Sequence, residues 1–196
     1  MIIKSLINMK KILTLCAVML VALTAAAQGK RYAFKSAIAT TVTTVGDLRT
    51  EATQYIDNYG ALECLKQHQE IPGLVSYDYY TITNGDKAWF VTEAEGKKSS
   101  KPFKALTQEL NFLNLTDQVM EKYNFKDFGG ETMFGKPCQK YTYETIQNRK
   151  TCYWTVWVYK GFIMKSICKL GKRETIIEVT KLQENVPVPA EVFEIP

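Results

Sequence analysis

The stretch TCYWTVWVYKGFIMKSICKL, Thr151 to Leu170, is the part of the sequence that decides the fold, because its alternation is the clearest in the chain. Two runs of aromatic and β-branched residues flank Tyr159-Lys160-Gly161, a three-residue loop ending in glycine, and this pattern predicts a β-hairpin. The loop length sets four opposed pairs on one side of the sheet: Val158 with Phe162, Val156 with Met164, Trp154 with Ser166, and Cys152 with Cys168. That side is almost wholly apolar, so we expect it to face the core.

The first 27 residues have the pattern of an export signal. Basic residues at Lys10 and Lys11 precede an apolar run, and Ala25-Ala26-Ala27 matches a cleavage site for signal peptidase. A membrane anchor is the alternative, but the apolar run is short for a membrane span. We therefore expect an exported protein, periplasmic or associated with the outer membrane, with a signal peptide over 1–27 and a single β domain over 28–196.

The charge of the expected mature chain is nearly balanced. Removal of the signal leaves 22 basic and 20 acidic side chains, against 25 and 20 in the full chain. No stripe of Lys and Arg remains, which argues against a nucleic-acid partner. We expect a monomer.

Four cysteines remain after the signal, at 64, 138, 152 and 168. In an oxidising compartment an even count suggests disulfides, and the hairpin register favours a bridge between Cys152 and Cys168. Four buried, reduced cysteines are the alternative. The cysteine spacings do not match a zinc site and the chain has one histidine, His68, so we predict no metal and no cofactor.

The remaining sequence predicts about nine antiparallel strands and one short helical insert. Alternating residues predict strands over 31–45, 48–57 and 173–182, and Asn84-Gly85 predicts a hairpin between strands over 74–83 and 87–94. Asn58-Tyr59-Gly60 is predicted to be a three-residue loop leading to a third strand, with a helix over 61–69 as the alternative. The segment EGKKSSK, 95–101, is predicted to be a solvated loop.

The helical insert follows that loop. Leu106, Leu110 and Leu113 recur at helical spacing, and Thr116 is suited to be the N-cap of a second short helix that includes Val119. Because the insert lies between two sets of strands, we expect it to lay its apolar side on the sheet. The predicted fold class is α+β, mainly antiparallel β: an open curved sheet, or half-barrel, with a short helical lid.

The sequence offers no catalytic motif. GxSxG, HExxH, P-loop and GxGxxG patterns are all absent, and one histidine cannot supply a relay without other partners. Carboxylate pairs such as Asp57 with Glu63, or Glu51 with Glu63, are interpreted as surface residues on the solvent side of strands. We predict no catalytic residues and no enzymatic activity.

The order of these elements resembles a known family. The chain has an export signal, a meander, the segment GETMFGKPCQKY (130–141), the hairpin over 151–170 and the closing ENVPVPAEVFEIP (184–196). This combination resembles exported proteins related to the LolA/LolB-like lipoprotein-carrier superfamily. This resemblance implies an unclosed half-barrel with a helical lid over a hydrophobic cavity. It also implies binding of lipids or of the acyl chains of lipoproteins.

Two functional hypotheses follow. In the first, the protein is non-enzymatic and holds a lipid or another hydrophobic ligand between sheet and lid. The residues expected to contact the ligand are Phe34, Ile38, Trp154, Val156, Phe162 and Met164 on the sheet, with Leu110, Leu113 and Met120 on the lid. In the second, these residues form a filled core and the protein binds an envelope partner through an edge strand or through outward-facing Tyr153, Trp157, Tyr159 and Ile163.

Overall fold

The computed structural model describes residues 30–71, 75–85, 87–94, 96–104, 110–147 and 149–196. The expected signal peptide, the break at 72–73 and the first part of the helical insert lie outside these residues. Within them, eleven antiparallel strands form one sheet in the order β6-β5-β4-β3-β2-β1-β11-β10-β9-β8-β7. The sheet is open, because its edge strands β6 and β7 do not pair, and this confirms the predicted fold class.

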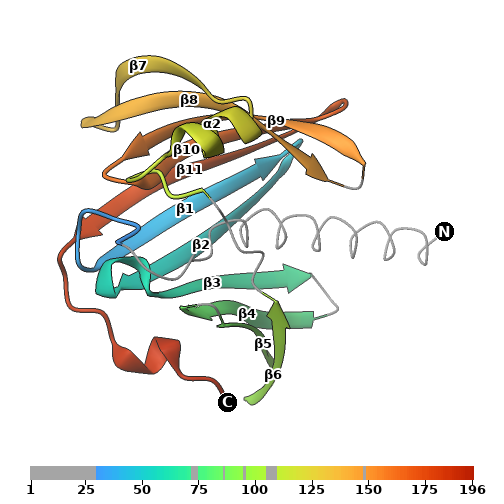
Figure 1. Ribbon diagram of the computed structural model, residues 1–196. Helices are drawn as coiled ribbons and strands as arrows, with labels where there is room; N and C mark the ends of the chain where they lie inside the picture. The colour runs from blue at the N-terminus through green and yellow to red at the C-terminus, as the bar shows by residue number, and fades with distance from the viewer. Residues whose placement is uncertain (1–29, 72–74, 86, 95, 105–109, 148) are drawn as a thin grey trace.

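Two meanders that meet at the centre of the sheet explain this order. The first contains β1 (Ala37–Val45), β2 (Leu48–Asp57), β3 (Leu62–Ile71), β4 (Val75–Asn84), β5 (Lys87–Ala94) and β6 (Lys97–Lys104). The second contains β7 (Lys126–Met133), β8 (Lys136–Gln147), β9 (Lys150–Tyr159), β10 (Phe162–Leu170) and β11 (Arg173–Glu184). β11 pairs with β1, so the second meander runs back to the start of the first. In Figure 1, β7 to β11 lie above β1 and β2, and β3 to β6 lie below them.

Two segments differ from the sequence prediction. Residues 95–101 were expected to form a loop, but β6 occupies Lys97–Lys104 and pairs along its full length with β5. The lysines and serines of β6 suit an exposed edge strand, because charged side chains are favoured there. The segment predicted to be the third strand forms β3, so this prediction is confirmed. The alternative, a helix over 61–69, is wrong. The expected count of nine strands is therefore too low.

The helical insert is shorter than predicted. Residues 110–113 are not helical, and the only α-helix of the described chain is α2, Asp117–Lys122. Thr116 caps it as predicted: its side-chain oxygen accepts a hydrogen bond from the Val119 amide at 3.3 Å. α2 leads directly into the edge strand β7 (Figure 1).

The turn of the β9–β10 hairpin is tighter than the sequence predicted. Tyr159 pairs with Phe162, so the loop is the two-residue turn Lys160-Gly161, and both of these residues have positive φ, at 50° and 83°. The register then shifts between Ile163 and Lys165, as in a β-bulge.

The bulge determines which residues are opposed. It brings Ser166 opposite Val156 and Cys168 opposite Trp154, so the four predicted pairs are wrong. One extra residue in β10 compensates for the shorter turn, however, and all eight predicted core side chains are buried. The side of the sheet was predicted correctly, and the register was not.

A second turn also differs from its prediction. Asp57 pairs with Leu62, so the β2–β3 loop spans four residues and includes the short 3-10 helix η2 (Asn58–Gly60). Ile56 therefore faces Glu63, whereas the predicted three-residue loop would have placed it opposite Leu62.

The segment before β1 joins the two halves of the sheet. The Arg31 amide donates to the Tyr59 carbonyl at 2.9 Å, in the β2–β3 loop, and the Ala33 amide donates to the Lys160 carbonyl at 3.1 Å, in the β9–β10 turn. Beside these bonds, Tyr32, Phe34 and Phe162 stack edge-on or face-on with ring centroids 5.2–6.0 Å apart.

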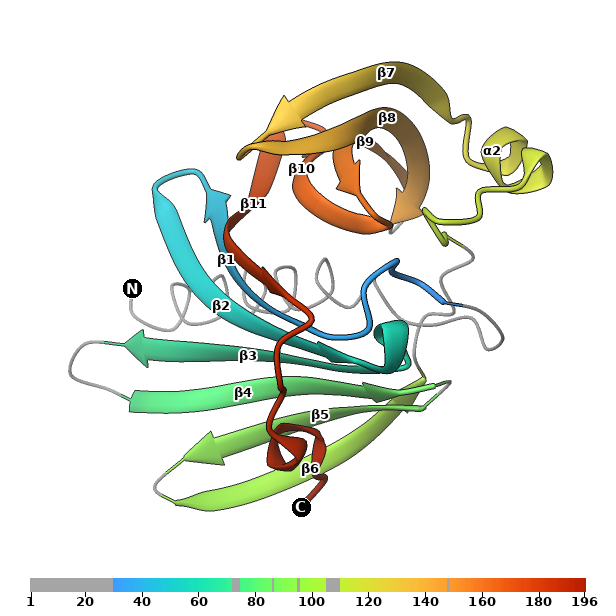
Figure 2. The ribbon, with the colours of Figure 1, turned by 90° about the vertical axis from the view of Figure 1, so that its left-hand side faces the viewer.

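The C-terminal segment crosses the outer side of β3 to β5, as Figure 2 shows. It contains the short 3-10 helix η3 (Ala190–Phe193), and its Val192 and Phe193 pack on a buried cluster of Cys64, Ile82 and Val91. One face of β4 and β5 is thus covered by the C-terminal segment.

Candidate functional site

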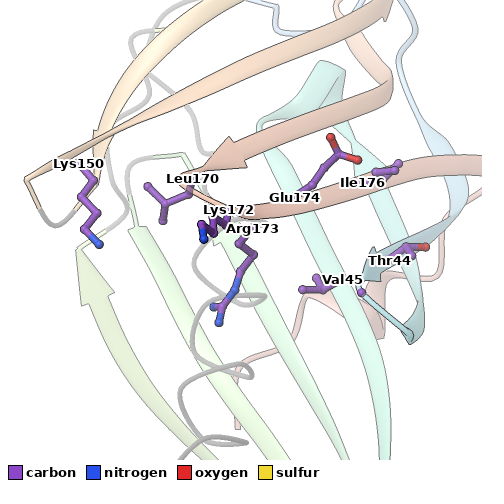
Figure 3. A pocket seen from close by; sticks show the side chains of 9 residues that line it. Thr44, Val45, Lys150, Leu170, Lys172, Arg173, Glu174 and Ile176 are labelled. Carbon is purple, nitrogen blue, oxygen red and sulfur yellow. The ribbon is translucent and has the colours of Figure 1, made fainter.

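A large open pocket lies where the turns of three hairpins meet, at one end of the strands of the curved sheet. Its volume is about 890 Å³, and Figure 3 shows the side chains that line it. The lining comes from the β1–β2 turn, from the start of β9 and from the β10–β11 turn with the strand residues that flank it. The lining residues are Thr44, Val45, Gly46, Lys150, Leu170, Lys172, Arg173, Glu174 and Ile176.

Strand pairing holds these residues together. Thr44 pairs with Ile176 across β1 and β11, and Leu170 pairs with Arg173 across the β10–β11 turn. Gly171, in that turn, has a φ of 62°, which permits the tight reversal. The pairing brings residues from positions 44 to 176 to one place, although they are far apart in sequence.

The pocket combines an apolar part with a basic part. Val45, Leu170 and Ile176 supply half-buried apolar side chains, while Lys150, Lys172 and Arg173 are exposed. Such a lining can bury a hydrocarbon chain and contact a polar or charged group at the same time.

The residues predicted to bind a ligand are mostly part of two packed clusters. Phe34, Phe162 and Met164 belong to one cluster and Leu110, Trp154 and Val156 to the other. In the second cluster the ring of Trp154 stacks on Tyr143 at 5.8 Å between centroids, and Val119 of α2 packs against the cluster.

The other three predicted residues lie apart from these clusters. Leu113 is 40% exposed, and Ile38 and Met120 are half-buried. None of the nine residues lines the open pocket or the smaller pocket described below. Ligand contact by these nine residues therefore stays a prediction, and the open pocket was not foreseen from the sequence.

A buried ion pair was also missed. Glu63, interpreted from the sequence as a surface carboxylate, is 5% exposed and forms a salt bridge with Arg31, which is 7% exposed. Gln54 donates to the other Glu63 oxygen at 3.0 Å, and the Tyr32 hydroxyl donates to the carboxylate at 3.3 Å. Burial and the neighbouring carboxylate raise the pKa of the Tyr32 hydroxyl, although the Arg31 charge opposes this, so Tyr32 stays protonated. Because three donors occupy the carboxylate, we interpret this cluster as a structural link between the segment before β1 and β3.

A smaller pocket, of about 290 Å³, lies under the C-terminal segment. Tyr55, Lys66 and Tyr80 line it from the sheet, and Glu191 and Pro196 line it from the C-terminal segment. The Ser100 hydroxyl donates to the Pro196 carbonyl at 2.9 Å and so ties the end of the chain to β6.

All four described cysteines are buried free thiols. Cys168 faces Trp154, so the register that favoured a Cys152–Cys168 bridge is wrong. The two residues are diagonal neighbours across β9 and β10. Diagonal Cα atoms are typically about 7–8 Å apart, beyond the usual separation in a disulfide.

The predicted outward-facing aromatic patch is not continuous. Trp157 is only 7% exposed; its indole nitrogen donates to a Glu131 carboxylate oxygen at 2.8 Å, and Lys140 lies over its ring at 4.8 Å. Tyr159 and Ile163 are half-buried, which leaves Tyr153 as the one strongly exposed member. Trp157 was misassigned because the second side of the hairpin is also covered, here by β7 and by lysine side chains.

Two features are absent from the described residues. No group of three or more His, Cys, Asp or Glu side chains in this part of the chain is placed to hold a metal ion. Among the same residues, no helix is both long enough and apolar enough to cross a membrane.

Comparisons with known proteins give structural neighbours only. No protein-family model and no curated protein matches the sequence. Among solved structures, the chain is similar to the lipoprotein LppX of Mycobacterium tuberculosis, at 14% identity and a TM-score of 0.48, over 80% of this chain and 90% of LppX.

Two further neighbours have lower scores. LprF of Mycobacterium bovis matches at 10% identity and a TM-score of 0.43, over 79% of this chain and 88% of LprF. A LolA superfamily protein of Nitrosomonas europaea matches at 9% identity and a TM-score of 0.37, over 85% and 93% of the two chains. All three TM-scores are below 0.5, so the function has to be argued from the residues of this chain.

Proposed function

We propose that the protein is a non-enzymatic protein of the cell envelope that binds a hydrophobic ligand, a lipid or an acyl chain, at the open side of its curved sheet. The observation that supports this most directly is the open pocket of about 890 Å³ with Val45, Leu170 and Ile176 in its lining. Ligand pockets in proteins commonly have volumes of about 300–1,000 Å³. The pocket is therefore large enough for a lipid-sized molecule.

The pocket also lies where a chain-like ligand would have room. It opens at the ends of three hairpins in a sheet that does not close on itself. The expected export signal supports a location in the periplasm or at the outer membrane, where lipids and lipoproteins are available as ligands.

Fluorescence binding tests this function. We expect the purified protein to bind Nile red, a neutral dye that fluoresces in apolar surroundings, and we expect palmitate to displace it. Ile176→Gln should weaken binding by about tenfold, since it replaces a half-buried apolar side chain of the pocket with a polar one.

Ile146→Gln is the matched control, because Ile146 is 80% exposed on β8 and does not line the pocket. The proposal fails if the wild-type protein binds neither dye nor palmitate at micromolar concentrations. It also fails if the two variants bind the dye equally well.

A second function is favoured by a separate observation. Ile146 and Tyr153, 80% and 56% exposed, lie diagonally across β8 and β9 on one side of the sheet. Exposed apolar neighbours of this kind can bind a protein partner of the envelope. Photo-crosslinking from position 153 in cells would give a defined adduct that Ile146→Gln abolishes; the absence of an adduct would exclude this surface.

A further inference from the structure

The proposed ligand site carries a positive charge at its rim, and this charge indicates a ligand class. We propose that the ligand is an amphiphile with an anionic headgroup, a carboxylate or a phosphate, which Lys150, Lys172 and Arg173 hold while its hydrocarbon chain lies on the apolar part of the pocket. This inference rests on the proposed function and adds to it the chemistry of the headgroup.

The three cations converge from two hairpins. Lys150 begins β9 opposite Gln147, Lys172 lies in the β10–β11 turn, and Arg173 begins β11 opposite Leu170. All three line the same pocket, and in the view of Figure 3 the side chains of Lys150 and Arg173 point the same way. A single anionic group can therefore approach cations from both hairpins.

These cations have no anionic partner within the described part of the protein. By contrast, two lysines of the adjacent strand β10 are paired: Lys165 with Glu178 at 2.7 Å, and Lys169 with Glu174 at 3.3 Å. Glu174 is the only acid among the described residues of the pocket lining, and its charge is offset by Lys169 outside the lining. The rim therefore keeps a net positive charge that is available to a ligand.

The apolar residues lie directly beside this charge. Leu170 pairs with Arg173 across the turn, and Ile176 follows three residues later in the same strand. An anionic head at the rim stays partly hydrated, so it costs little desolvation, while the adjoining chain gains from apolar burial. This arrangement fits an amphiphile better than it fits a small free anion or a neutral hydrocarbon.

The exposure of the cations limits the size of the effect. Exposed ion pairs contribute little individually and are screened by salt, so the three together are expected to improve affinity by about tenfold at low ionic strength. Most of that preference should disappear at high salt, because the Debye length falls to about 3 Å at 1 M.

Displacement of Nile red from the full mature protein tests the headgroup separately from the hydrocarbon chain. Hexadecyl phosphate and hexadecanol, both used below micelle-forming concentrations, have the same chain and differ in charge. We expect hexadecyl phosphate to displace the dye at about tenfold lower concentration than hexadecanol. Inorganic phosphate alone should displace none.

Charge reversal locates the interaction. Lys150→Glu combined with Arg173→Glu should abolish the preference for hexadecyl phosphate over hexadecanol. The neutral variant, Lys150→Gln with Arg173→Gln, is the control for misfolding of the charge-reversed variant. Lys181→Glu is the control for charge reversal as such, because it reverses one charge at an exposed position of β11 that does not line the pocket.

The outcomes separate the two proposals. If Nile red binds and both hexadecyl compounds displace it equally, the headgroup inference is wrong and the proposed function stands. If Nile red and both compounds fail to bind, the proposed function is wrong, and this inference is overturned with it. If inorganic phosphate binds the three cations as tightly as hexadecyl phosphate does, the site recognises a free anion and the inference is likewise overturned.

Discussion

The buried pair of Arg31 and Glu63 allows a sharp test of what holds the segment before β1 in place. Glu63→Gln keeps the shape of the side chain but removes its charge, which leaves a guanidinium that is 7% exposed without a counterion in the described chain. Breaking a buried ion pair from one side typically costs about 3–5 kcal/mol. Because a domain of this size is stable by about 5–15 kcal/mol, we expect a large fall in the free energy of unfolding.

A double-mutant cycle separates the charge from the shape of the site. Arg31→Met removes the cation and keeps much of the side-chain volume, so the variant with both substitutions holds no uncompensated charge. We expect this double variant to be more stable than Glu63→Gln alone, since a buried pair is often replaceable by neutral groups at little cost. Urea unfolding followed by tryptophan fluorescence measures all four free energies.

Glu174→Gln is the control for this cycle. Its partner Lys169 lies 3.3 Å away, but both side chains are largely exposed, so little stability should be lost. The reasoning would be refuted if Glu63→Gln lowered the unfolding free energy no more than Glu174→Gln does. A double variant less stable than Glu63→Gln would refute it as well.

Three further outcomes are expected. Partial burial raises the pKa of Glu184, but hydrogen bonds from two lysines outweigh this and hold it below its ordinary value, so the carboxylate stabilises the fold above its unfolded pKa of about 4.3 and loses this effect as the pH falls. Glu184→Gln should therefore flatten the loss of stability between about pH 5 and 3, and an unchanged slope in unfolding experiments would contradict this. Mass mapping without reductant should find free thiols at Cys152 and Cys168, and Cys168 should react slowly with iodoacetamide until the protein unfolds, because burial raises its pKa to about 12. Gly161→Ala should destabilise the protein more than Gly46→Ala in thermal melts, since both have positive φ but only at Gly161 would a methyl group overlap the Arg31 carbonyl oxygen; equal losses would argue against that close approach.

In the 151–170 hairpin, the alternation of residues was enough to predict which side chains face the core. All eight side chains assigned to the core side of the 151–170 hairpin are buried, and the cap at Thr116 was also predicted correctly. Both features depend on local physics: a strand has a side-chain period of two, and a cap is a bond between residues three positions apart.

Register could not be predicted in the same way. The two-residue turn at Lys160-Gly161 and the β-bulge after Ile163 each shift the strand by one residue, and together they preserve the buried side. A pattern with period two cannot distinguish this combination from a three-residue loop without a bulge. The predicted opposition of Cys152 and Cys168 failed for this reason.

Buried charge and the open pocket depend on contacts between residues that are distant in sequence. Glu63 looked like a surface residue, because nothing near it in sequence shows that Arg31, 32 positions earlier, covers it with a matching charge. The pocket likewise requires β11 to pair with β1, which brings Thr44 beside Ile176. The sequence determined most of the strands, the buried side of the 151–170 hairpin and the helix cap, since these are set by neighbours along the chain. The tertiary structure determined the register, the buried ion pair and the place where a ligand could bind, since these are set by neighbours in space.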